Sequence, residues 1–307
     1  MVIKTHLRSM AVRALCESMA VKLMVQLAQE LIPDYDLHKR FGSRESISIP
    51  TANAAKQIID DICAGELFPQ FVQLLVRAQD TGFRGRKYPI AYLSHLIHGI
   101  GSAGYIYDRE NGMFIEDSSV RTSPNWGVLR EGMDYDMTFL RFDIAGNTRL
   151  VRSNPRQKVE KTYQDLFRVV NASLARRNGR MWNFQGDGGL AAFCFSRKDM
   201  QATTCAVDVL HELFLYNKVS CILSKPLSVR FAIHSGRCIY NSNTESLKKN
   251  DVIKEIGDIE AKYTGLDSIT ITSKVHVCLD KRISDMFALG REKYIHNLYH
   301  YNLCLES

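Results

Sequence analysis

Two aspartates occupy positions where carboxylates can carry chemistry, because each lies at the end of a strand-like run beside a glycine turn. Asp143 follows the apolar run 137–142, and Asp187 lies within the Gly-Asp-Gly-Gly sequence of 186–189. A single aspartate in such a place is usually a turn or cap residue. If the two runs are neighbouring strands, however, both carboxylates reach the same end of one sheet, where they repel unless a cation lies between them. Hard divalent ions such as Mg²⁺ and Mn²⁺ prefer these oxygen ligands and usually bring a phosphate with them.

The elements that must position these aspartates lie in the second half of the chain, where strand-like and helical patterns alternate. The strand-like runs are 137–144, 180–185, 190–195 and 228–234, and apolar residues at helical spacing mark 158–177 and 202–217. The glycines of 186–188 predict a tight hairpin, because glycine adopts the positive φ that such turns need. The amides of 145–148 precede a helix and can hold a triphosphate. This half therefore predicts an α+β fold with helices packed on one sheet.

Residues 1–120 are predicted to form a mainly helical module, with helical spacing in 54–63, 68–77 and 90–97. A hairpin is expected at 105–115, and helices followed by a hairpin suggest a winged-helix regulatory module. Residues 121–135 are polar with Pro and Gly, so we expect a linker there and a second domain at 136–307. The G-x-G-x-x-G pattern at 99–104 follows a helix, the reverse of the dinucleotide-binding order, so a glycine turn is expected instead.

The composition is that of a folded protein and favours an anionic ligand for the second half. The chain has 307 residues, of which 45% are hydrophobic and 24% charged, and its formal net charge is +7. Residues 1–135 carry 15 basic and 15 acidic side chains, whereas residues 136–307 carry 25 and 18. A basic half suits a nucleotide. The balanced first half argues against tight binding of nucleic acid.

Several functional classes are excluded by the sequence. The eight cysteines form no C-x-x-C pair, which argues against a zinc ribbon or a disulfide framework and fits free thiols in a reducing compartment. A P-loop sequence is absent. The apolar runs are too short or too polar for a membrane span, and nothing resembles an export signal, so we expect a cytoplasmic protein with no membrane partner.

Three segments, in order, resemble the class III nucleotidyl cyclase domain over about residues 136–282: Phe142-Asp-Ile-Ala-Gly-Asn-Thr148, Gly186-Asp-Gly188 and Val229-Arg-Phe-Ala-Ile-His-Ser-Gly236. The resemblance implies a ferredoxin-like α+β fold with a mostly antiparallel central sheet, acting as a homodimer with sites at its interface. It also implies two Mg²⁺ or Mn²⁺ ions held by Asp143, Asp187 and the backbone carbonyl of Ile144. The residues expected to bind substrate are Gly146, Asn147, Thr148 and Asn183.

The sequence departs from the family pattern at four positions. Asn183 stands where purine cyclases usually carry a base-reading Lys or Glu, and Asn147 replaces a phenylalanine. Thr270 and Lys274 align with the transition-state Asn and Arg, so the catalytic roles would fall to them. Lys274 keeps the charge but loses the bidentate fork of a guanidinium. These differences argue against adenine as the base. A catalyst of reduced activity is an open alternative.

The chain most resembles the compact bacterial cyclases of the Pycsar anti-phage system, which make cyclic CMP or cyclic UMP. An amide at Asn183 can both donate and accept a hydrogen bond toward a pyrimidine edge. We therefore expect metal-dependent cyclisation of CTP or UTP, CTP first, with a cyclic product that acts on a separate effector. Two alternatives stay open: a conventional adenylate or guanylate cyclase, and a cyclase-like module or winged-helix regulator that binds nucleotide without catalysis. His234 is interpreted as structural, and Arg230 as a salt-bridged surface residue rather than a phosphate ligand.

Overall fold

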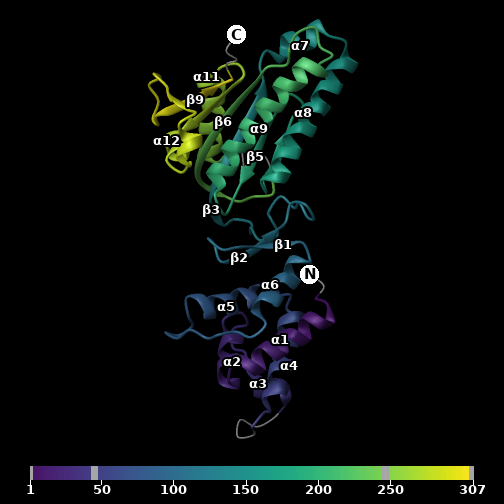
Figure 1. Ribbon diagram of the computed structural model, residues 1–307, viewed down its shortest axis with the longest axis vertical. Coiled ribbons are helices and arrows are strands. Elements are labelled where there is room, and N and C mark those ends of the chain that lie inside the picture. Colours follow the sequence, from purple (N-terminus) through teal and green to yellow (C-terminus); the bar gives the residue numbers. More distant parts are fainter. Residues whose placement is uncertain (1–2, 43–47, 244–245, 247–248, 304–307) are drawn as a thin grey trace. The chain divides into compact units, whose positions relative to one another are not determined.

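The computed structural model describes residues 3–42, 48–243, 246 and 249–303, and the chain divides into two compact units (Figure 1). The units are Met1–Asp117 and Ser118–Ser307, and each has an apolar core of its own. No helix within the described ranges combines the length and the apolar character needed to cross a membrane.

The first unit consists of helices followed by a two-stranded hairpin. Its elements are α1 (Thr5–Ser18), α2 (Val21–Gln29), α3 (Leu37–Phe41), α4 (Thr51–Ala64), α5 (Phe68–Asp80), α6 (Leu93–Gly101), β1 (Tyr105–Asp108) and β2 (Met113–Glu116). The predicted helices at 54–63 and 68–77 and the predicted hairpin are confirmed. The third predicted helix begins later than expected, at Leu93, because Tyr92 has a left-handed φ of 58°.

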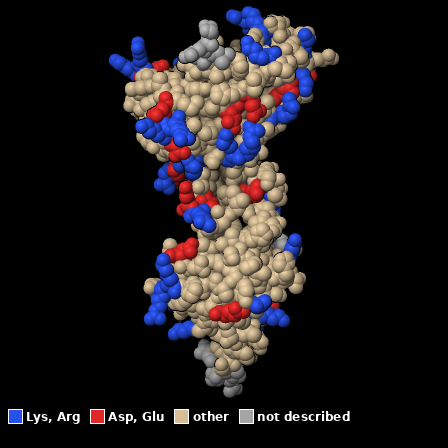
Figure 2. Space-filling view, in the orientation of Figure 1, with Lys and Arg blue, Asp and Glu red and all other residues tan. Residues whose placement is uncertain are grey.

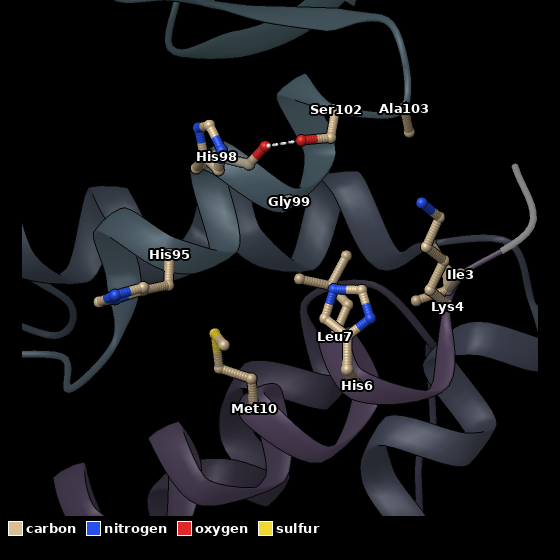
Figure 3. Close-up of a pocket in the computed structure, with 10 residues that line it drawn as sticks. All are labelled: Ile3, Lys4, His6, Leu7, Met10, His95, His98, Gly99, Ser102 and Ala103. Atoms are coloured by element: carbon tan, nitrogen blue, oxygen red, sulfur yellow. Dashed lines mark hydrogen bonds between the residues drawn. The ribbon is translucent and has the colours of Figure 1, made fainter.

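The glycine-rich segment 99–104 serves helix packing. It spans the end of α6 and the turn into β1, so no helix begins there. A Cβ on Gly99 would lie 2.4 Å from Cδ1 of Leu7 in α1, and both residues line a cavity of about 330 Å³ between the two helices (Figure 3). The glycine therefore allows α1 and α6 to approach closely, and the dinucleotide interpretation has no support.

The second unit is built on one seven-stranded sheet in the order β4-β5-β3-β6-β7-β9-β8. The strands are β3 (Asp134–Ile144), β4 (Arg180–Phe184), β5 (Gly188–Phe193), β6 (Val229–Ile239), β7 (Ser268–Thr272), β8 (Ala288–Leu289) and β9 (Leu298–Asn302). Only β6 and β7 pair in parallel among these described strands. The order β3-α8-β4-β5-α9-β6 along the chain, with β5 and β3 central, is the ferredoxin-like arrangement. The expected α+β fold class, with a mostly antiparallel sheet preceded by a helical part, is confirmed.

Helices cover both faces of this sheet. The helices are α7 (Asn147–Ser153), α8 (Arg156–Arg176), α9 (Lys198–Val219), α11 (Asp251–Tyr263), α12 (Ser273–His276) and α13 (Lys281–Ser284). The long helices α8 and α9 lie side by side on one face, where alternate residues of β3 such as Leu140 and Phe142 join the core (Figure 1). Helix α11 packs against β6 and β3. We call the face that carries the side chains of Asp143 and Arg230 the α11 face, because these residues alternate with the core positions.

The segment expected to be a linker, 121–135, lies within the second unit and supplies part of its core. Trp126 is completely buried, and its Nε1–H donates to the carbonyl of Asn178 at 2.7 Å. Its ring packs edge to face against Trp182 and Phe195. The segment is polar on average, so its composition does not reveal that one large apolar side chain is buried.

We expect Trp126→Phe to lower the free energy of unfolding of the second unit by about 1–3 kcal/mol, because it removes a buried hydrogen bond and some packed volume. Urea denaturation monitored by fluorescence measures this directly, since the chain has two tryptophans and Trp182 remains as the probe. Val219→Ala is the control, because that side chain is 83% exposed and its loss should change stability by less than about 0.5 kcal/mol. Equal stability of the two variants would contradict the packing role.

Candidate active site

The ends of β3 and β5 bring the two aspartates together along the backbone. Asp143 pairs with Gly188, the residue that follows Asp187. The N–H of Ile144 donates to the carbonyl oxygen of Asp187 at 2.8 Å. Gly186, with a φ of 69°, allows the tight turn between β4 and β5. The predicted hairpin and the predicted neighbourhood of the two strands are therefore confirmed.

A space beside Asp143 is left open by a glycine. A Cβ on Gly188 would lie 2.6 Å from the carbonyl oxygen of Phe142 and 3.1 Å from Oδ1 of Asp143. Within the described ranges, Oδ1 of Asp143 and Oδ1 of Asp187 accept no hydrogen bond from the protein. These two carboxylates and the nearby carbonyl of Ile144 offer only hard oxygen ligands. That donor set fits Mg²⁺ or Mn²⁺.

Asp187 is held from the α8 side by a chain of two hydrogen bonds. Its Oδ2 accepts from Nδ2 of Asn147 at 2.7 Å, and Oδ1 of Asn147 accepts from the hydroxyl of Tyr163 at 2.6 Å. Burial raises the pKa of Tyr163, the hydrogen bond to Asn147 lowers it, and the charges of Asp187 and Asp143 raise it further. The hydroxyl is therefore a protonated donor. Asn147 is expected to bind substrate, but its amide is already used: Nδ2 bonds Asp187 and Oδ1 bonds Tyr163.

We expect Tyr163→Phe to slow the reaction proposed for this site roughly 2- to 10-fold, because one partly buried hydrogen bond contributes about 0.5–1.5 kcal/mol. Steady-state kinetics should place the loss in kcat. Tyr301→Phe, which removes a hydroxyl bonded to His211, is the control and should leave kcat unchanged. In an Asn147→Ala background the Tyr163 substitution should have little further effect. Additive losses in that double variant would contradict the hydrogen-bond chain.

Asp143 belongs to a network of four charged side chains on the α11 face. Its Oδ2 accepts from Arg230 at 2.7 Å, and the same Arg230 nitrogen lies 2.9 Å from Oε1 of Glu260. Oε2 of Glu260 lies 3.4 Å from Nε of Arg141. Glu260 is almost completely buried, so desolvation raises its pKa, Arg230 and Arg141 lower it, and Asp143 raises it. Arg230 thus has the salt-bridged role expected for it, and it holds one oxygen of Asp143.

The remaining predicted residues are distributed along the sheet. Asn183 pairs with Leu190, which in turn pairs with Arg141, so Asn183 lies on the α11 face. Its side-chain amide has no hydrogen-bond partner within the described ranges and is half-buried. This placement leaves the amide available to a ligand.

Thr270 and Lys274 lie away from the aspartates within one chain. Thr270 is fully buried, and its hydroxyl lies 3.0 Å from Nδ1 of His300. Lys274 is exposed on α12, which follows β7. The start of β7 pairs with Arg230, and β7 runs parallel to β6, so Lys274 lies beyond the far end of the strand. One chain alone therefore does not bring these two residues to the aspartates.

Two basic residues help to line a cavity next to the expected triphosphate segment. This cavity, of about 400 Å³, is lined by Ala145, Gly146, Arg149 and Lys225 among others. Thr148 and Arg149 are exposed in α7. Elsewhere on the second unit, basic and acidic side chains are interspersed on the face shown in Figure 2. The cavity therefore brings two basic side chains beside Gly146, three residues after Asp143.

Sequence reasoning missed two residues that act on the aspartates through a neighbour, Tyr163 and Glu260, and one that lines the nearby cavity, Arg149. Tyr163 lay in the apolar stripe of a predicted helix, where a tyrosine suggests core packing. Glu260 carries no motif, and its role depends on α11 covering β6. Arg149 could have been found as the first basic residue after the segment 145–148.

Comparison with known proteins finds similarity in three-dimensional structure alone. No protein-family profile and no curated protein matches the chain. Similar solved structures include the guanylyl cyclase domain of the RhoGC fusion protein from the aquatic fungus Blastocladiella emersonii (15% identity, 56% of this chain and 97% of that one, TM-score 0.46). The adenylyl cyclase CyaB from P. aeruginosa is another (14%, 57% and 96%, 0.47). A third is an adenylate/guanylate cyclase/hydrolase from Silicibacter pomeroyi (20%, 55% and 98%, 0.44).

Proposed function

We propose that the second unit is a metal-dependent nucleotidyl cyclase, which converts CTP or UTP, CTP first, to the 3′,5′-cyclic monophosphate and pyrophosphate. The observation that supports this most directly is the placement of Asp143 and Asp187. Their backbones meet through the bond from Ile144 to Asp187, and each keeps one carboxylate oxygen free of protein donors within the described ranges. A pair of carboxylates in one place calls for a cation.

The reaction forms a bond between the ribose 3′ oxygen and the α-phosphorus and breaks the bond from that phosphorus to pyrophosphate, while the 3′ proton is released. Bound divalent ions would lower the pKa of the 3′ hydroxyl and neutralise charge on the phosphates. The chain's own part is positioning. Arg230 holds Oδ2 of Asp143 and Asn147 holds Oδ2 of Asp187, so both carboxylates have a fixed orientation. Because the attack is intramolecular, such positioning contributes much of the rate.

A second copy of the chain would complete the site. Thr270 and Lys274 lie away from the aspartates of their own chain, so the catalytic roles proposed for them require a homodimer. Lys274 is exposed and can face a partner. Arg149 and Lys225, beside Gly146, would contact the phosphates, and the unpartnered amide of Asn183 would read the base. The role in anti-phage signalling, with a cyclic product acting on a separate effector, rests on the sequence resemblance. A regulatory role for the first unit is proposed from its helices followed by a hairpin.

Two other functions compete with this proposal. A conventional adenylate or guanylate cyclase would use the same aspartates and differ at the base. A binding module without catalysis is favoured by one observation: Arg230 already neutralises Asp143. That ion pair competes with a metal for the carboxylate, and a strong preference for the pair would leave nucleotide binding without turnover.

The test is a product assay on the full chain with Mn²⁺ and each of the four nucleoside triphosphates, read by mass spectrometry. Cyclic CMP or cyclic UMP as the main product supports the proposal. Faster consumption of ATP or GTP selects the conventional cyclase. Nucleotide binding with no pyrophosphate release selects the binding module. Asp258→Ala is the matched control, because it removes an exposed carboxylate of the same unit and should leave turnover unchanged.

A further inference from the structure

Three potential metal ligands from separate elements converge on the α11 face, away from the aspartates. His234 comes from β6, Glu255 from α11 and His296 from the segment between β8 and β9. Their ligand atoms all lie within 4.8 Å of one another. His234 is four residues along β6 from Arg230, which corresponds to roughly 13 Å of strand. The cluster is therefore separate from the two aspartates of its own chain, while its neighbour Thr272 lies between Thr270 and Lys274 in the sequence.

The distances suit a tetrahedral ion. Nε2 of His234 lies 2.8 Å from Oε2 of Glu255, and Nε2 of His296 lies 3.8 Å from the same oxygen. Ligands at about 2.0–2.1 Å from a tetrahedral zinc ion are roughly 3.3 Å apart, which lies between these two values. Small side-chain rotations would equalise them. The imidazole rings of His234 and His296 already stack, with centroids 5.5 Å apart.

The environment of His234 prepares one nitrogen for a metal. Its Nδ1 lies 3.0 Å from the hydroxyl oxygen of Thr272, which is itself fully buried. When Nδ1–H donates to this oxygen, the lone pair of Nε2 points toward Glu255. Metal-bound histidines usually have such a partner on the second nitrogen, which sets the tautomer and the ring orientation.

We propose that His234, Glu255 and His296 form a binding site for a divalent transition-metal ion, zinc in the first place. Two imidazoles and one carboxylate are a common zinc ligand set. His296 and Glu255 are partly exposed, so water can supply the fourth ligand. The ion would tie the segment 290–297 to β6 and α11, an attachment that the ring contact of Tyr294 with Tyr263 of α11 also supports. The role is structural, because Asp143 pairs with Arg230, four residues along β6 from His234.

The test uses the full chain, stripped with EDTA and held without nucleotide or other divalent ions, and adds Zn²⁺ alone. Calorimetry should show that one zinc ion binds per chain, and that this binding requires the three residues of the cluster. Zinc should also raise the melting temperature of the chain. His296→Ala and Glu255→Gln should each weaken this binding at least about 100-fold. Both residues are partly exposed, so these variants avoid the cavity that a change of buried His234 would create. Co²⁺ in place of Zn²⁺ should show the visible absorption of a four-coordinate site in the wild type only.

Two further variants make the result specific. Thr272→Val should weaken zinc binding roughly 10- to 100-fold, because it removes the partner of Nδ1 of His234. His211→Ala removes an exposed histidine of the same unit and should leave binding unchanged. Asp187→Ala should also leave it unchanged, because that residue belongs to the other site. Equal zinc affinity in the wild type and in His296→Ala, or no binding by the wild type, would overturn the proposal and show a metal-free hydrogen-bonded cluster.

Discussion

Asp143→Ala and Asp187→Ala are each expected to reduce cyclic nucleotide formation roughly a thousandfold or more. Metal ions supply several kcal/mol of transition-state stabilisation, and each 1.4 kcal/mol is about tenfold in rate. Removing either carboxylate removes an anchor for the ions. Within the described ranges each variant also loses a single side-chain hydrogen bond, with Arg230 or with Asn147, so folding should be nearly unaffected. Product formation at saturating Mn²⁺ and triphosphate measures the loss, and thermal denaturation checks the fold.

The comparison with Asp258→Ala separates chemistry from net charge. All three variants lose one negative charge from the second unit, but only two lose a carboxylate at the ends of β3 and β5. If Asp143→Ala and Asp187→Ala kept the wild-type rate, the reaction would take place elsewhere and the proposed function would be wrong. If raising Mn²⁺ restored much of the activity in one variant, that carboxylate would hold the more weakly bound ion.

The local elements could be predicted because their signals are local. Apolar spacing identified α4, α5, α8 and α9, and the glycines at 186–188 identified the β4–β5 turn. The strand order could be predicted only from the family resemblance, because the pairing of β3 with both β5 and β6 joins residues far apart in the chain. Residues 121–135 were interpreted as a linker because composition averages over a segment. It cannot show that a single tryptophan is buried.

The site could be predicted in part for the same reason. Asp143 and Asp187 stand out beside glycines, and a hairpin necessarily brings the second near the end of a neighbouring strand. The groups that hold them do not stand out. Arg230 is one basic residue in a strand, and Glu260 is one acid on an amphipathic helix. Their roles arise only when α11 packs on β6 and brings Glu260 to the arginine. This is a tertiary contact, which no short sequence pattern predicts.

Arg230→Met is expected to lower the free energy of unfolding of the second unit by about 3–5 kcal/mol. Glu260 is 4% exposed and would lose its closest cation, and removal of one partner of a buried pair leaves an uncompensated charge. Arg141 remains, but it is farther from Glu260 and 40% exposed. Urea denaturation followed by tryptophan fluorescence measures the change, because both tryptophans of the chain lie in this unit. Arg237→Met, which breaks an exposed pair on the same strand, should cost less than about 1 kcal/mol.

The double variant Arg230→Met with Glu260→Met distinguishes two causes of the lost stability: an unpaired buried charge and a loss of packing. Replacing both partners of a buried ion pair by apolar side chains is often neutral, so most of the stability lost in Arg230→Met should return. If the double variant were as unstable as the single one, the arginine would act by filling space.

The same two variants also test whether Arg230 competes with a metal ion for Asp143. Without Arg230, Oδ2 of Asp143 is free, so the double variant should bind Mn²⁺ more tightly than the wild type, whereas a carboxylate that needs the arginine for its orientation would bind it more weakly.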